Sequence, residues 1–426
     1  MKYAYTNGYL LTGEENMTPV AGQTVLTDGE VITAIVPDTT DLTGYQVVDL
    51  KKQYLMPGLI NLHVHLPASG KPKKKPADNV KLVHLITSTA LTRKVLMKMC
   101  ANYAKTELLS GVTTMRTVGG VLDSDAKTRD LILAGKLPGP RILSANMAIS
   151  VPGGHMAGSL AYEAHSAQEA RDFVRKIAEG KPDLIKLMIT GGVLDAKVKG
   201  EPGELKMAPE LVKAACEEAH ALGLKVAAHV ESPEGIRVAL QNGVDTIEHG
   251  AKPDDEILAL FKEHHACLIS TISPALPYAL FDREVSHASE MEQYNGNVVF
   301  DGILSCAKAC MENGIPVGLG TDTGCPFITH DGMWREVYNF HKFCGVSNAY
   351  ALYTATKRNA ELVGLGDVTG TIAPGKCADM IVSRANPLDD LTALRSLSMV
   401  ISRGKLYNAP KVKKMANVER ELDKFL

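Results

Sequence analysis

The most constraining feature of this 426-residue chain is a repeated unit of amphipathic helix, glycine and apolar strand. Glycine suits the left-handed residue that ends a helix, and an apolar run suits a strand buried on both faces. The expected strands span 56–65, 112–118, 139–149, 184–190, 224–231, 244–249, 266–271 and 315–322. The expected helices span 94–110, 124–135, 166–179, 208–222, 233–242, 253–265, 300–313 and 347–363. Strand–helix alternation indicates a parallel α/β sheet, and eight units predict a closed TIM-type (β/α)8 barrel.

A doubly wound open sheet is the alternative to a closed barrel. In the dinucleotide-binding version of that fold, a glycine-rich loop follows the first strand, and no such loop follows residues 56–65. The sequence therefore favours the barrel.

The two ends of the chain depart from the repeated pattern. Residues 1–55 and 367–408 contain short apolar runs separated by turns, which are typical of antiparallel strands. Neither half could bury a sheet face alone, so we expect both to combine into one small β-sandwich beside barrel residues 56–366. Residues 409–426 place charged and apolar residues at helical spacing and predict a C-terminal helix or tail.

Composition and charge narrow the range of partners. The formal net charge of -2 gives no electrostatic reason to expect binding to nucleic acid or to a membrane surface. No segment approaches the run of about 18 apolar residues that spans a bilayer, and the N-terminus lacks the pattern of a secretory signal. We therefore expect a cytoplasmic protein that acts on a small molecule.

Six residues able to bind a metal lie on the predicted barrel strands or at their carboxyl ends, where barrel active sites form. They are His63, His65, Lys186, His229, His249 and Asp322. His63 and His65 are two positions apart on a strand, so both side chains point to the same side and suit one cation. Any one histidine could instead be a hydrogen-bonded core residue. Together, the six predict a site for zinc or a similar metal.

Lys186 lies inside an apolar strand, where an unpaired ammonium group would cost several kcal/mol. A buried salt bridge is one explanation. The other is reaction with CO2 to give a carbamate, an anion that can bridge two metals. Desolvation lowers the pKa of a lysine and favours this reaction.

Two further histidines border the predicted active face. His155 follows a glycine pair just after the third strand, a position from which its ring could be presented to substrate. His330 lies in the loop after Asp322, and we expect it to contact substrate as well. The segment 67–79 is rich in proline, lysine and glycine and is either a lid or a mobile loop over the same face.

The order of these motifs resembles the amidohydrolase superfamily along nearly the whole chain. The motifs lie at 56–65, 111–116, 139–142, 185–186, 247–250, 320–322, 359–365 and 370–379. The chain is most similar to the binuclear branch that contains Xaa-Pro dipeptidases and imidazolonepropionase-like amidohydrolases. Oligomers are common in this family, so a homo-oligomer is expected.

The resemblance implies two divalent metal ions, with zinc the expected metal. His63, His65 and Asp322 would bind the more buried ion. His229 and His249 would bind the second, and Lys186, as its carbamate, would bridge both.

The resemblance also implies the reaction, because characterised members of this branch hydrolyse dipeptides and N-acyl amino acids. We expect cleavage of a linear amide C–N bond by metal-activated hydroxide, with Asp322 as general base and then acid. His155 would contact the substrate or its developing oxyanion. A hydrolase of cyclic amides such as an imidazolonepropionase, or a deaminase, is the second reading, and a non-catalytic scaffold is the third. Lys186 argues against the deaminases, which generally bind one metal.

Two departures from the family pattern concern the substrate. Two positions after the fifth-strand histidine, many relatives have an aromatic residue or a second histidine, whereas this chain has Glu231. A glutamate would repel a substrate carboxylate and could attract a cationic group. Relatives also commonly have Arg-Asp after the second strand, where this chain has Arg116 and Thr117.

Overall fold

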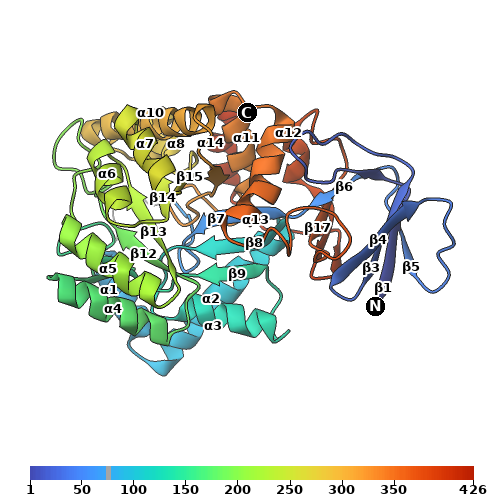
Figure 1. Ribbon diagram of the computed structural model, residues 1–426, viewed down its shortest axis with the longest axis horizontal. Helices are drawn as coiled ribbons and strands as arrows, with labels where there is room; N and C mark the ends of the chain where they lie inside the picture. The colour runs from blue at the N-terminus through green and yellow to red at the C-terminus, as the bar shows by residue number, and fades with distance from the viewer. Residues whose placement is uncertain (73–77) are drawn as a thin grey trace.

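The computed structural model describes residues 1–72 and 78–426, which form an eight-stranded barrel with a smaller β-domain beside it (Figure 1). The barrel strands are β7 (Leu59–Val64), β8 (Val112–Thr117), β9 (Arg141–Ser144) continued by β10 (Ala148–Ser150), β12 (Leu184–Met188), β13 (Lys225–Val230), β14 (Thr246–His249), β15 (Cys267–Ser270) and β16 (Val317–Leu319). Neighbouring strands pair in parallel. The last strand returns to the first, because the backbone N–H of Asp322 donates to the His63 carbonyl and that of His65 donates to the Thr323 carbonyl. The predicted TIM-type barrel is confirmed.

The third predicted strand, 139–149, is interrupted in the structure. β9 pairs with β8, β10 pairs with β12, and Asn146 between them has a φ of 58°. Asparagine tolerates this left-handed backbone better than most residues. Its side chain accepts from the Ala126 N–H and donates to the Gly180 carbonyl, so both polar atoms of the Asn146 side chain are hydrogen-bonded at the break. The chain leaves β10 into the loop that carries His155.

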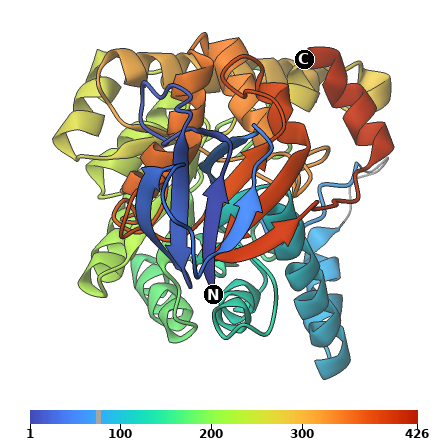
Figure 2. The ribbon, with the colours of Figure 1, turned by 90° about the vertical axis from the view of Figure 1, so that its right-hand side faces the viewer.

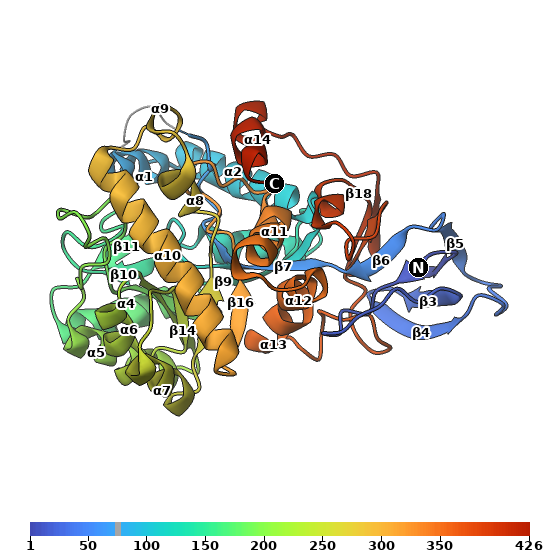
Figure 3. The same ribbon diagram turned by 90° about the horizontal axis from the view of Figure 1, so that it is seen from above.

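Helices surround the barrel, as the views in Figures 1 and 3 show. Those that follow the predicted pattern are α2 (Ala90–Leu109), α3 (Ser124–Leu133), α4 (Ala167–Glu179), α5 (Pro209–Ala221), α6 (Pro233–Gln241), α7 (Asp255–Glu263), α10 (Glu290–Glu312) and α12 (Asn348–Tyr353), the last continued by a π-helical turn, η1 (Thr354–Arg358), and α13 (Asn359–Leu362). The sequence indicates where two of them start, since the Ser166 and Ser232 side chains accept from the backbone N–H groups of Glu169 and Gly235. No helix in the described part of the chain is long and apolar enough to cross a bilayer.

Four helices of the structure were not expected from the sequence. They are α1 (Asn79–Thr87), α8 (Leu276–Leu280), α9 (Arg283–Ser286) and α11 (Met333–Cys344). α11 is buried along much of its length and buries Arg335, Glu336 and Asn339 together with its apolar residues. The apolar residues of this segment recur at helical spacing, so α11 could have been predicted from the sequence. Residues 73–77 of the predicted lid or loop at 67–79 lie outside the described residues.

Both chain ends build the β-domain, whose strands face the viewer in Figure 2. One sheet has the order β4 (Val31–Pro37), β3 (Gln23–Asp28), β1 (Lys2–Thr6), β5 (Gln46–Asp49), and the other has the order β19 (Lys405–Asn408), β18 (Leu397–Ser402), β17 (Met380–Ser383), β6 (Tyr54–Pro57), β2 (Tyr9–Leu10). A separate core that includes Tyr5, Val25, Leu55 and Met380 joins residues from both sheets. The predicted β-domain built from both ends is confirmed.

The sequence predicted that the strands of this domain are antiparallel, but two pairs of them are parallel. β1 pairs with β5, and β2 with β6, in parallel. Parallel neighbours need a long connection, and the intervening β3–β4 hairpin supplies it for β1 and β5. Turn residues identify strand ends but not strand direction, so this prediction was wrong for the two pairs.

The first predicted barrel strand also begins later than residue 56. Met56 and Pro57 pair with Ile381 and Met380 in the β-domain, and β7 starts at Leu59. Gly58 joins the two, at a point where a Cβ atom would lie 2.1 Å from the Thr113 side chain. Only glycine lets the chain pass this closely from the β-domain into the barrel.

The C-terminal residues form α14 (Ala416–Leu422) and a short 3-10 turn, η3 (Asp423–Phe425). Arg335 of α11 pairs with Glu419 and Asp423. Arg395 pairs with the same two carboxylates. These ion pairs attach the terminal helix to α11, so 409–426 includes a docked helix.

Candidate metal centre

The six predicted metal ligands converge at the carboxyl ends of the barrel strands. His63 and His65 come from β7, Lys186 from β12, His229 from β13, His249 from β14 and Asp322 follows β16. The Asp322 Oδ1 atom lies 3.2 Å from His65 Nε2 and 3.6 Å from His63 Nε2. The His249 ring centroid lies 4.8 Å from that of His63 and 4.6 Å from that of His229. All six side chains are buried, so residues from separate segments of the barrel sequence, from β7 to the end of β16, form one compact cluster.

Backbone strain accompanies this cluster. His249 and Asp322 have φ angles of 71° and 53°, in the left-handed region that residues other than glycine rarely adopt. Successive side chains of a regular strand point to opposite sides. The turn at His249 breaks this alternation, so Glu248 and His249 both lie beside His63. Strain of this kind concentrates at functional sites.

The histidine rings are held in place by bonds from one nitrogen each. His63 Nδ1 donates to Glu248 Oε2 at 2.7 Å, and His65 Nδ1 donates to the Gly119 carbonyl at 2.9 Å. His249 Nδ1 hydrogen-bonds with Thr271 Oγ1 at 2.7 Å. This leaves Nε2 of these three rings as the potential metal ligand, with the orientation set by the outer partner. At His229 the arrangement differs, because Nε2 lies 3.2 Å from the Gly191 carbonyl oxygen.

Burial favours the neutral form of these rings. It lowers the pKa of His63 to about 4, with Lys186 acting in the same direction. Burial also lowers the pKa of His229 and of His249 well below the ordinary value of 6.5. Neutral imidazole is the form that coordinates a metal.

Lys186 has no partner for its ammonium group. Its side chain is 1% exposed, and Nζ makes no hydrogen bond to any described residue. Burial, followed by the charge of Arg116, lowers its pKa from 10.5 to about 8, against the attraction of Glu248 and Asp322. The buried salt bridge considered from the sequence is not formed with any carboxylate of the described chain.

Two overlapping groups of donor atoms could hold cations. One is His63, His249 and Asp322, and the other is His229, Glu231 and His249; within each group the ligand atoms lie within 4.8 Å of one another. Imidazole and carboxylate are suitable donors for zinc and similar divalent ions. These donors and the orphaned Lys186 Nζ beside them fit a divalent metal centre.

Glu248 and Arg116 form a buried pair beside the centre, and neither was predicted from the sequence as a functional residue. The Arg116 guanidinium donates to both Glu248 oxygens, at 2.6 and 2.7 Å. Burial alone would raise the pKa of Glu248, but Arg116 and then His63 hold it below its usual range. The sequence feature that could have identified Glu248 is its position as a glutamate inside an apolar strand, next to His249.

The three predicted substrate residues occupy different surroundings. His155 stacks on His229 with 4.1 Å between centroids, and its Nδ1 lies 2.5 Å from Asp195 Oδ2. Asp195 was missed, because no local pattern links residues 40 positions apart.

At Glu231, burial, then the charges of Asp322 and Asp195, raise the pKa to about 8, and Oε2 has no hydrogen-bond partner.

His330 lies deeper than a substrate contact would require. Its Nε2 donates to the Ala68 carbonyl at 2.8 Å, and its Nδ1 lies 3.2 Å from Glu107 Oε1. The ring also stacks on Tyr103 at 4.4 Å. Both ring nitrogens are engaged by the protein, so a substrate contact by His330 would require one of these bonds to break.

Comparison with known proteins identifies the family. Residues 54–407 match the sequence model of the Amidohydrolase family. The chain belongs to this family. Among solved structures, this amidohydrolase is similar to a provisionally assigned prolidase from Bifidobacterium longum, with 34% identity over 99% of this chain and 98% of that chain and a TM-score of 0.88. The resemblance stated from the motifs is confirmed.

Two other relatives bear on activity. A Xaa-Pro dipeptidase with methionine bound in its active site is 28% identical over 96% of this chain and 100% of its own, with a TM-score of 0.83. The imidazolonepropionase of Thermoplasma acidophilum is 28% identical over 204 residues, which are 46% of this chain and 44% of that protein.

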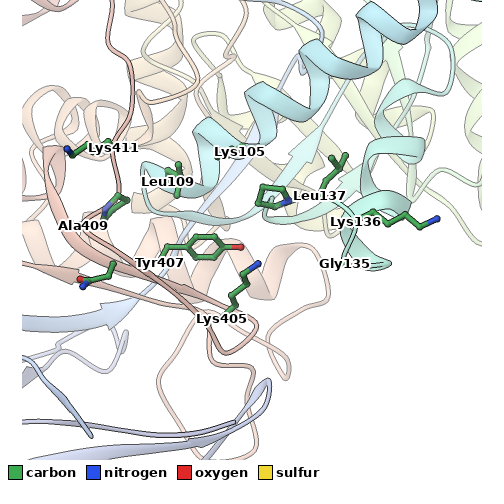
Figure 4. Close-up of a pocket in the computed structure, with 12 residues that line it drawn as sticks. Lys105, Leu109, Gly135, Lys136, Leu137, Lys405, Tyr407, Ala409 and Lys411 are labelled. Atoms are coloured by element: carbon green, nitrogen blue, oxygen red, sulfur yellow. The ribbon is translucent and has the colours of Figure 1, made fainter. Parts of the chain in front are cut away.

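A concavity in this amidohydrolase lies away from the metal centre (Figure 4). Its volume is about 660 Å³, and its walls come from the end of α2, the loop 135–138 and residues 405–411. The first two segments lead into β8 and β9, so this pocket is at the amino ends of the barrel strands. It contains none of the predicted site residues.

The Glu248–Arg116 pair gives a first prediction for this amidohydrolase. We expect Glu248→Gln to weaken metal binding by about 10–100-fold, because the neutral amide orients His63 less firmly and leaves Arg116 unpaired. Competition with a calibrated chelator measures the metal dissociation constant. Glu234→Gln, at an exposed carboxylate of α6, is the matched control and should bind metal as the wild type does. Equal affinities for both variants would contradict the role of Glu248.

Proposed function

We propose that this amidohydrolase is a binuclear metal-dependent enzyme that hydrolyses a linear amide C–N bond in dipeptides or N-acyl amino acids. The observation that carries the proposal is the donor group of His63, His249 and Asp322, with the His229 ring next to His249 and the unpartnered Lys186 Nζ buried at the same site. The similarity to a Xaa-Pro dipeptidase over nearly the whole chain supports the substrate class.

Each ligand would keep the place inferred from the motifs. His63, His65 and Asp322 would hold one ion, preferably zinc, and His229 and His249 would hold the other. Lys186 would lie between them as a carbamate. The neutral amine attacks the carbon of CO2 and loses one proton, so a buried cation becomes an anion. A pKa of about 8 increases the neutral fraction of Lys186 near pH 7 and supports this reaction.

The chain's own residues would manage the proton and the oxyanion. When bound, two divalent metals lower the pKa of water and polarise the scissile carbonyl. Burial alone would raise the pKa of Asp322, but His63 and His65 hold it well below the usual range, so the carboxylate is ionised. Asp322 would accept the proton of the attacking water and return it to the leaving nitrogen. His155, held by Asp195, would hydrogen-bond to the developing oxyanion.

Hydrolysis of a cyclic amide or amidine is the second candidate, favoured by the partial similarity to an imidazolonepropionase. The zinc-loaded protein should be incubated with dipeptides, N-acyl amino acids and cyclic amides, and its products identified by mass spectrometry. Release of an amino acid from a linear substrate would support the proposal. Ring opening or release of ammonia, without linear amide cleavage, would replace it with the second candidate. The homo-oligomer and the cytoplasmic location stay predictions of the sequence.

A further inference from the structure

Glu231 is a carboxylate without a counter-ion at the edge of the metal centre. It directly follows β13, and its Oε2 atom is buried without a hydrogen-bond partner. One carboxylate oxygen lies within 4.8 Å of ring nitrogens of His229 and His249. A buried carboxylate is stable in its ionised form only beside a cation, so a cation bound here would stabilise the ionised form of Glu231.

The described residues around Glu231 do not supply that cation. The nearest charges that act on it are those of Asp322 and Asp195, both acidic. His155 is bound to Asp195 through Nδ1, and Lys206 is paired with Glu204.

The space beside Glu231 is kept free of side chains. At Gly192, a Cβ atom would lie 3.3 Å from Glu231 Oε2 and 3.6 Å from the His155 ring. Any larger residue would intrude between these two side chains. Gly192 therefore places no side chain between Glu231 and His155, both of which are partly exposed to solvent.

The position of Glu231 distinguishes between kinds of cationic substrate. Under the proposed function, on which this inference rests, the scissile carbonyl lies next to a metal held by His229 and His249. In a dipeptide, the α-ammonium nitrogen is only about 2.5 Å from that carbonyl carbon. The cation of a lysine or arginine side chain is several bonds further away. An N-acyl group carries no charge at the nearer position.

We propose that Glu231 binds the α-ammonium group of the substrate. The enzyme is then a dipeptidase that requires a free amino end, and N-acyl amino acids are poor substrates. Glu231 acts in specificity, outside the bond-breaking step and outside the set of metal ligands.

A matched pair of substrates tests this role directly. Alanyl and propionyl derivatives of the same amino acid differ only in having an ammonium group or a hydrogen. We expect the wild type to prefer the alanyl compound by about 10–100-fold in kcat/KM, the range of a charged hydrogen bond. Glu231→Gln should remove this preference by slowing only the alanyl compound, and the control Glu234→Gln should keep it.

Two readouts do not depend on turnover. Calorimetry on the zinc-loaded protein should show alanine binding more tightly than propionate, with the difference lost in Glu231→Gln. Metal analysis should give this variant the metal content of the wild type. An unchanged preference for the ammonium compounds in Glu231→Gln, or loss of one metal, would overturn the proposal. If the wild type cleaves no linear amide yet still prefers alanine through Glu231, the proposed function fails and the ammonium site stands.

Discussion

Asp322→Asn is expected to lower kcat by about 10²–10⁴-fold while the metal content stays close to that of the wild type. The asparagine side chain keeps an oxygen where Asp322 Oδ1 faces His63 and His65, but it cannot accept the proton of the attacking water. Asparagine also tolerates the φ of 53° at this position as readily as aspartate does. The substitution therefore removes the proton acceptor at little cost to the fold.

The result depends on measuring turnover and metal together. Rates with the best linear amide substrate should be normalised to metal content determined by plasma mass spectrometry. Asp331→Asn is a suitable control, because Asp331 is buried nearby and accepts from Thr329 instead of contacting the histidines. Near-normal kcat in Asp322→Asn would show that another group moves the proton, and loss of metal would show that Asp322 acts mainly as a ligand.

The barrel, and the position of the six candidate ligands at its active face, could be predicted because both depend on local patterns. An apolar strand that ends in a histidine or aspartate places that side chain at the active face, whatever the rest of the chain does. The two-residue spacing of His63 and His65 and the lysine within β12 are signals of this kind. They needed no knowledge of which strands are neighbours.

The supporting contacts could not be predicted because they join distant segments. The bond between His155 and Asp195 depends on contact between the loops that follow the neighbouring strands β10 and β12, and Thr271 reaches His249 only because β15 lies beside β14. Glu248 faces the site because of the left-handed turn at His249, which the sequence pattern does not reveal. The outer partners that orient the candidate metal ligands are therefore tertiary features.

Lys186→Met is expected to have opposite effects on the metal-free and the metal-loaded protein. In the metal-free state, the lysine has a pKa of about 8 instead of 10.5. This difference means that the charged amine destabilises the fold by up to about 3 kcal/mol. Methionine has a similar length and no charge to bury. Because Glu248 and Asp322 lose a favourable neighbour, we expect a net gain of about 1–3 kcal/mol in the free energy of unfolding near pH 7.

The pH dependence of this gain has a defined sign. The folded-state pKa is below the unfolded-state value, so the penalty is complete below pH 8 and shrinks as the pH rises towards 10.5. Urea unfolding in the presence of a chelator should show the variant as the more stable protein at pH 7, with the two curves converging above pH 8. A metal-free variant less stable than the wild type would mean that Lys186 is a structural residue.

Metal should reverse the order of stability. We expect about two metals per chain in wild-type protein prepared with bicarbonate, and fewer in Lys186→Met, which cannot form the carbamate. Metals that bind only the folded state stabilise it in proportion to their occupancy, so the wild type gains more from zinc than the variant does. Two metals in both proteins, with no effect of bicarbonate, would contradict the bridge. A reversal of the order of stability would show that the buried amine destabilises the metal-free protein and that metal binding more than offsets this effect.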